Sequence, residues 1–130
     1  MATLKISDLS VGDWVSFEDI YCKVEYILSD GIIGTTCRNY RDGYEDPLTN
    51  LRPIPITAEI LEKNGFERST SQFIVYHTDK VWISYDKPSE TWSVTMYIND
   101  VTSNLHANIL HIHQLQHALR LAGVDKEINL

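Results

Sequence analysis

The chain has no run of 18 apolar residues, so the sequence predicts no membrane-spanning segment. Its first residues lack the apolar stretch of a secretory signal, and we therefore expect a cytoplasmic location in the host cell. Cysteine is scarce, with only Cys22 and Cys37, each in its own predicted strand. The two could be neighbours, but a pair of free thiols in the cytoplasm is the preferred interpretation.

Basic residues are also few: 11 Lys and Arg stand against 18 Asp and Glu, which gives a net charge of −7. Surfaces that bind nucleic acid need clustered positive charge, so we expect no extended nucleic-acid partner, although a small basic pocket is compatible with this balance. The chain also lacks a glycine-rich phosphate loop, a C-x-x-C pair and a nucleophile elbow. These absences predict a protein without a cofactor and without enzymatic activity.

The first half contains short β-rich segments separated by tight turns, with Ser29–Gly31 as the clearest hairpin turn. A polar, acidic loop is expected over Asn39–Pro47. Four or five short strands in so few residues predict a small SH3-like barrel or bent antiparallel sheet over residues 1–56. The predicted strand segments are Val11–Val15, Tyr21–Leu28 and Ile32–Cys37. Leu51–Ile56 is expected to be extended, as an edge strand or with a polyproline-like course, because of Pro53 and Pro55.

The second half, residues 57–130, begins with a short helix that Thr57 caps and Asn64–Gly65 ends. A three-stranded antiparallel sheet and an amphipathic helix are predicted to follow, so the fold class is α+β. We expect the two subdomains to form one compact unit. The predicted strands are Gln72–His77, Val81–Tyr85 and Thr91–Ile98, the last with Trp92, Val94, Met96 and Ile98 on one face.

The segment Ile109–Gly123 has a clear helical period. Leu115 and Leu119 lie in its apolar stripe, which we expect to pack on the sheet. His113 and His117 project from nearly the opposite side, where we expect them to be solvated or hydrogen-bonded.

The same two histidines have the spacing of the zinc-peptidase pattern H-E-x-x-H. Gln114 stands where that pattern has its glutamate, and an amide does not act as a general base. A metal-dependent hydrolase is therefore the least favoured interpretation, and we expect no metal, with His113 and His117 as the only candidate pair. Further ligands would come from acidic side chains or from His77, His106 and His111.

The predicted loop and its flanks carry the candidate binding residues Arg38, Tyr40, Arg41, Tyr44 and Arg52. Aromatic rings beside guanidinium groups clamp bases or phosphates, and the same residue types dominate protein interfaces. Ordinary loop packing is the plainer alternative. The acidic residues there could hold a cation, but a solvated acidic loop is preferred over that site, which would comprise Asp42, Glu45 and Asp46.

Two blocks of the sequence resemble a known family. Residues 53–66, PIPITAEILEKNGF, are similar to "PIPLTEEILEKNGF", and residues 113–128, HQLQHALRLAGVDKEI, are similar to "VHQLQHALRLCGIDKEI". Both segments are typical of small uncharacterised proteins of gut Bacteroidales and their phages and mobile elements. Ala122 replaces the family's cysteine, and some relatives carry glutamate in place of Gln114. The resemblance implies a setting in a phage, prophage or mobile element and no catalytic residue.

The leading hypothesis is a non-enzymatic binding or accessory protein of a phage or mobile element. It would act in the cytoplasm by protein–protein interaction with a host or phage protein. The alternative is a counter-defence protein that forms a homo-oligomer and sequesters a nucleotide-type immune signal. Its pocket would contain Arg38, Arg41 and Arg52.

Overall fold

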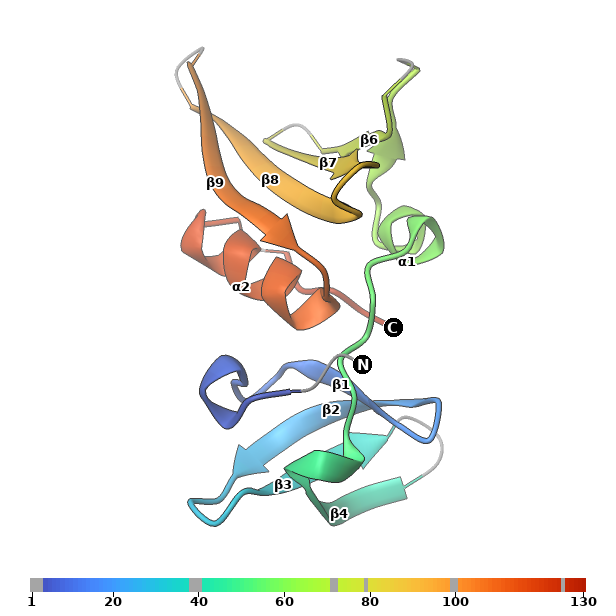
Figure 1. Cartoon of the computed structure of the whole chain (residues 1–130), viewed down its shortest axis with the longest axis vertical. Helices are drawn as coiled ribbons and strands as arrows, with labels where there is room; N and C mark the ends of the chain where they lie inside the picture. Colours follow the sequence, from blue (N-terminus) through green and yellow to red (C-terminus); the bar gives the residue numbers. More distant parts are fainter. Residues whose placement is uncertain (1–3, 38–40, 71–72, 79, 99–100, 125) are drawn as a thin grey trace. The chain divides into compact units, whose positions relative to one another are not determined.

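The computed structural model describes residues 4–37, 41–70, 73–78, 80–98, 101–124 and 126–130, with the backbone alone at 41–44, 97–98 and 101–107. The chain forms two compact units, Met1–Ile54 and Pro55–Leu130 (Figure 1). Each contains an antiparallel sheet, and the second adds helices, so the predicted α+β class is confirmed. Among the described residues, no helix is both long and apolar enough to cross a membrane.

The first unit is a curled sheet of four antiparallel strands in the order β1-β2-β3-β4 (Figure 1). The predicted bent sheet is therefore confirmed. Its core comprises Leu9, Val15, Cys22, Val24, Ile33, Cys37 and Leu51. The elements are η1 (Ile6–Asp8), β1 (Trp14–Phe17), β2 (Ile20–Ile27), β3 (Ile32–Cys37), β4 (Arg41–Pro47) and η2 (Leu48–Asn50).

The hairpin between β2 and β3 turns at the predicted residues. Gly31 has a φ of +86°, which a residue without Cβ adopts at little cost. Asp30 Oδ1 accepts a hydrogen bond of 3.2 Å from the backbone N–H of Ile32. Further along the hairpin, Tyr26 lies opposite Gly34, and a Cβ on residue 34 would lie 2.3 Å from the tyrosine ring. Residue 34 must therefore be glycine for the ring to lie where it does.

One prediction for this unit is wrong in detail. The expected loop over 39–47 is strand β4 from Arg41 to Pro47, because β3 is largely buried and its second edge needs backbone partners. Residues 51–56, expected to be extended, form two isolated bridges, Arg52 with Ser16 and Pro55 with His111. Pro53 and Pro55 have no N–H to donate, so a ladder does not continue there.

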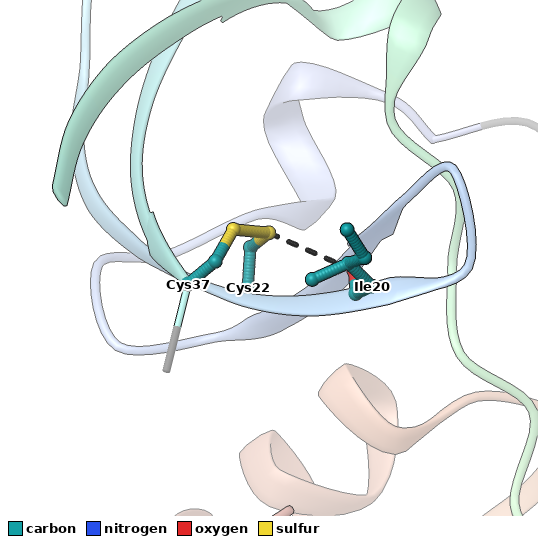
Figure 2. Close-up of a disulfide and its surroundings, with 3 residues drawn as sticks. All are labelled: Ile20, Cys22 and Cys37. Atoms are coloured by element: carbon teal, nitrogen blue, oxygen red, sulfur yellow. Dashed lines mark hydrogen bonds between the residues drawn. A yellow bond between two sulfur atoms is a disulfide. The ribbon is translucent and has the colours of Figure 1, made fainter. Parts of the chain in front are cut away.

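Cys22 and Cys37 form a disulfide, which corrects the prediction of free thiols (Figure 2). Near the turn, Tyr26 pairs with Gly34 and Ile27 with Ile33, and the same register continued along the hairpin would place residue 38 opposite Cys22. An irregularity between Val24 and Tyr26 moves the pairing by one residue and brings Cys37 opposite instead. Cys22 Sγ lies 3.6 Å from the carbonyl oxygen of Ile20 (dashed in Figure 2). Only the reduced thiol carries a proton, so a hydrogen bond can form here only when the disulfide is reduced.

The second unit begins with helix α1 (Ala58–Lys63), whose cap is as predicted: Thr57 Oγ1 accepts a hydrogen bond of 3.3 Å from the N–H of Ile60. Its antiparallel sheet has the order β5-β6-β7-β8-β9, and helix α2 lies beside β9 (Figure 1). The remaining elements are β5 (Glu67–Arg68), β6 (Val75–His77), β7 (Val81–Asp86), β8 (Thr91–Ile98), β9 (Val101–Ile109) and α2 (Ile112–Leu121).

Strand β9 was not predicted. It pairs with β8 through two register shifts. The shift nearer Ile109 places residues 107 and 108 opposite the single residue Ser93. Asn108 has a φ of +60°, a conformation that asparagine tolerates better than most residues. This bulge leaves Ile109 buried opposite Trp92.

Helix α2 buries Leu115 and Leu119 completely, as predicted. Trp92 and Val94 on β8 are buried too, Met96 is half-buried, and the side chain of Ile98 lies outside the described residues. Gly123, with a φ of +74°, follows the helix end, and the N–H of Val124 donates to the Leu119 carbonyl at 3.0 Å, the arrangement of a Schellman motif.

The buried face of α2 is wider than predicted, because His113 and Gln116 are buried with the leucines. The Gln116 side chain donates from Nε2 to the Lys126 carbonyl at 3.1 Å and accepts at Oε1 from the Ile128 N–H at 2.7 Å. Asn64 makes the same pair of bonds with Asn129, at 2.9 and 2.7 Å. Two side-chain amides therefore hold residues 126–130, and Ile128 and Leu130 are buried.

Candidate functional site

The structure places the predicted binding residues of the first unit only in part. Arg38 and Tyr40 lie outside the described residues, and Arg41 and Tyr44 are in β4, with their backbones alone described. Arg52 is exposed, and its Nη1 donates to the carbonyl oxygens of Thr49 and Leu51 at 2.6 and 3.0 Å. Those two bonds fix the guanidinium against its own chain segment and leave its other nitrogens for a ligand.

Of the acidic residues considered as a cation site, Glu45 has a different partner. It accepts a hydrogen bond from the Tyr26 hydroxyl, and that bond raises the pKa of Tyr26 above its usual value of 10. Asp46 is buried, and the side chain of Asp42 is not described. No cluster of three or more metal-ligating side chains occurs among the residues that the structure describes.

Of the two α2 histidines, His113 lies on the buried side of the helix and not on the side that was predicted. His113 is buried rather than solvated, and its ring meets that of His117 edge-on, with 6.0 Å between centroids. The ring of His111 is nearly parallel to that of His113, with 5.9 Å between centroids, and burial lowers the pKa of His111.

Gln114, which occupies the position of a peptidase glutamate, has a structural partner at the start of α2. Its Oε1 accepts from the backbone N–H groups of Leu110 and His111 at 2.8 and 3.0 Å. This is the role of the N3 residue in a capping box, for which both Gln and Glu are suited. The amide therefore closes the first turn of the helix, and the residue in the second position of the motif has a capping role.

The sheet of the second unit carries a groove on its outer face, the face with Ser84 and Ser93. We call it the outer-face groove, and its volume is about 420 Å³. A second hollow of about 280 Å³ adjoins it and shares Phe73, Tyr85 and Asp86 with it. Both volumes lie close to or within the range of small-ligand sites.

A third hollow, the aromatic pocket, has a volume of about 270 Å³ and lies between the start of α1 and the sheet. Tyr76, Tyr85 and Trp92 contribute an aromatic wall, with the Tyr85 and Trp92 centroids 4.9 Å apart. Arg68 also lines it, with its guanidinium 5.8 Å from the centroid of the Tyr76 ring.

Sequence reasoning missed all three hollows, and it lacked β9, which contributes Asn108 to the outer-face groove, and β5, which contributes Arg68 to the aromatic pocket. One signal was present: apolar or small residues alternate with polar ones from Val101 to Ile109, directly after Asn99-Asp100, a pair typical of tight turns. That alternation would have predicted a hairpin with β8. Comparison of the chain with protein-family models, with curated proteins and with solved structures gives no match.

Proposed function

We propose that this protein is a non-enzymatic binding protein of a phage or mobile element, and that it binds a host or phage protein through strand β4. The observation that carries the proposal is the position of β4 at the end of the strand order β1-β2-β3-β4. A terminal strand presents one row of backbone N–H and C=O groups that an extended segment of a partner can extend as a further strand.

The two edges of this sheet are not equivalent. The outer edge of β1 is already used at Ser16, whose backbone exchanges hydrogen bonds of 2.8 and 2.9 Å with Arg52. β4 has seven residues, long enough for a short strand to pair with it, and it carries Arg41 and Tyr44. Tyrosine and arginine are the residue types enriched at the centres of protein interfaces.

The proposal is tested with purified protein as bait in extracts of infected and uninfected host cells. We expect a partner that the wild type retains and the Tyr40→Ala/Tyr44→Ala variant loses. Tyr21→Ala is the matched control, because Tyr21 is an exposed tyrosine on β2 of the same sheet. Retention of every partner by the double variant contradicts a β4 interface, and recovery of the chain itself identifies a homo-oligomer.

The proposed cytoplasmic location has its own test, because structural disulfides are rare in reducing compartments. Intact producing cells are treated with a thiol-blocking reagent before lysis, and the state of Cys22 and Cys37 is read by mass spectrometry. Two blocked thiols support the cytoplasm. A bond already formed in the quenched cells contradicts it.

The second candidate function, sequestration of a nucleotide-type signal, is favoured by the aromatic pocket. A ring stacked on Tyr85 and Trp92, with its phosphate near Arg68, uses the groups that bind nucleotides elsewhere. Calorimetry against cyclic oligonucleotides and ADP-ribose derivatives tests it. The affinity of Arg68→Gln is compared with that of Arg52→Gln, which distinguishes the aromatic pocket from the pocket predicted around Arg52. No heat from any ligand with folded protein removes this function.

A further inference from the structure

The outer-face groove is hollow because small side chains occupy the middle of the sheet. Ser84 on β7 and Ser93 on β8 are direct partners in the register, and both line the groove. Phe73 and Val75 border them on one side and Asn108 on the other. A row of serines between larger neighbours leaves an open trough whose floor presents hydroxyl groups.

Four polar side chains along one end of this trough form a continuous hydrogen-bonded chain. Ser89 Oγ donates to Asp86 Oδ2 at 2.5 Å, Ser89 Oγ and Thr91 Oγ1 lie 2.7 Å apart, and Thr91 Oγ1 lies 3.3 Å from Asn108 Oδ1. The proton of Ser89 goes to Asp86, so the proton of Thr91 must serve the contact with Ser89.

In the structure Thr91 faces Asn108 Oδ1, but two hydroxyl protons cannot serve three contacts, so we assign the Asn108 amide with Nδ2 toward Thr91 instead. With Nδ2 facing Thr91, the chain runs from Asn108 through Thr91 and Ser89 to the carboxylate of Asp86, and each bond polarises the next. Asn108 Oδ1 then faces away from Thr91. The remaining lone pairs of this chain are acceptors, so it suits a ligand with many hydroxyl donors.

The bulge in β9 brings the last member of the chain to the groove. Residues 107 and 108 face one residue of β8, and the positive φ of Asn108 puts its side chain on the outer face while Ile109 stays buried. β-bulges commonly redirect a side chain beside a functional site. Without the bulge, β9 would not present an amide to Thr91.

Two large aromatic side chains are exposed on this face, Phe73 at the groove and Trp82 further along β7. Phe73 is 66% exposed at the groove, and Trp82 is 51% exposed on the outer face of β7, two residues from Ser84. The C–H faces of a sugar ring pack on such rings by dispersion, while its hydroxyls bond to neighbouring polar groups. An aromatic surface next to a row of acceptors therefore matches both sides of a pyranose.

The negative charge of the groove disfavours anionic ligands. Asp86 is the charged side chain among the residues described as lining the groove, and Lys87 offsets it at the adjoining hollow. A phosphate or polyanion would meet a carboxylate with no compensating cation among the described residues that line the groove, which costs binding energy. A neutral ligand has no such cost, and the two adjoining hollows suit an elongated one.

We propose that the outer-face groove binds a neutral oligosaccharide, with sugar rings against Phe73 and Trp82 and hydroxyls bonded to the chain from Asp86 to Asn108. The site lies wholly in the second unit and is independent of the proposed interface on β4.

Titration of the isotope-labelled full chain by NMR tests this site. Cellotetraose, mannotetraose and xylotetraose are the neutral probes, and tetragalacturonate is the anionic one. We expect at least one neutral probe to shift the amides of Ser84 and Ser93 and the indole N–H of Trp82. Asn108→Gly keeps the positive φ and removes the amide, and it should weaken binding about fivefold, the effect of losing one hydrogen bond.

Phe73→Ala is the second variant, since an exposed residue outside the strands can be truncated without loss of the fold. It should weaken the same probe, whereas Tyr21→Ala in the first unit should leave it unchanged. The proposal is overturned if no neutral probe shifts these signals, if only tetragalacturonate does, or if both groove variants bind as the wild type does.

Discussion

Gln116 on α2 and Ile128 near the end of the described chain are joined by a hydrogen bond of 2.7 Å from the Ile128 N–H to Gln116 Oε1. The other end of the same amide donates to the carbonyl of Lys126, so one buried side chain satisfies two backbone groups. Asn64 does the same for Asn129. The side chains of Gln116 and Asn64 thus make the hydrogen bonds to residues 126–130 that a neighbouring strand would make in a sheet.

Gln116→Leu keeps the volume of the side chain and removes both bonds. Each buried backbone group left without a partner costs roughly 1–3 kcal/mol, so we expect a clear loss in the free energy of unfolding by urea denaturation. Arg120→Gln is a variant on the same helix that breaks the exposed pair between Arg120 and Glu127, and it should cost at most about 1 kcal/mol. Equal losses would mean that the tail is not held by Gln116.

Two leucines on α2 allow a matched comparison of the helix orientation. Leu119 is fully buried, and Leu121 is 76% exposed. Leu119→Ala should cost roughly 2–5 kcal/mol and Leu121→Ala no more than about 0.5 kcal/mol, as measured by thermal and urea unfolding. The reverse order would show that the helix is rotated from the described position.

The disulfide should stabilise the first unit. It closes a loop of 15 residues, for which the chain-entropy model gives about 3 kcal/mol. We expect Cys22→Ser/Cys37→Ser to increase hydrogen exchange at the amides of β2 and β3, while protection in β7 and β8 stays the same. Unchanged exchange in β2 and β3 would contradict a stabilising bond.

Gly34 and Tyr26 should show strong coupling. Gly34→Ala places a methyl group where the Tyr26 ring lies, and the displacement should cost about 1–3 kcal/mol. In a Tyr26→Ala background the same change should cost much less, because the clashing ring is gone. A double-mutant cycle measures the difference, and additive effects would rule out the described contact.

Stability should depend on pH through His111. Burial lowers its pKa in the folded state, so below about pH 6.5 the unfolded chain takes up a proton that the folded protein resists. The free energy of unfolding should therefore fall as the pH drops from neutrality. His111→Asn, which keeps a residue suited to helix capping, should reduce this fall, and an identical pH profile would exclude His111 as its source.

Much of the fold could be predicted because its signals are local. β8 has strict alternation, β3 follows an Asp-Gly turn, and α1 has a capping threonine, so each was found within a residue or two. β4 reads as a polar loop, since its strand conformation depends on the exposed edge of β3. β9 was hidden because Ile109 fits its alternation and the period of the following helix equally well.

The site was harder to predict than the fold, because it depends on register. The disulfide follows from one irregularity in β2, and the position of Asn108 follows from a bulge in β9. The side chains that meet in the outer-face groove come from β6, β7, β8 and β9, from Phe73 before β6 and from the turn between β7 and β8. Only the outward position of Thr91 and Ser93 was visible in the sequence, as the polar face of β8.

The tail held by Gln116 and Asn64 also sets the order in which the chain can mature on the ribosome. The first unit, with both cysteines, is one continuous stretch of sequence and can begin to fold as soon as it emerges. The second unit cannot complete its interior until Ile128 and Leu130 arrive, because both are buried in it. We therefore expect nascent chains to carry a finished first unit while the second still awaits its last five residues.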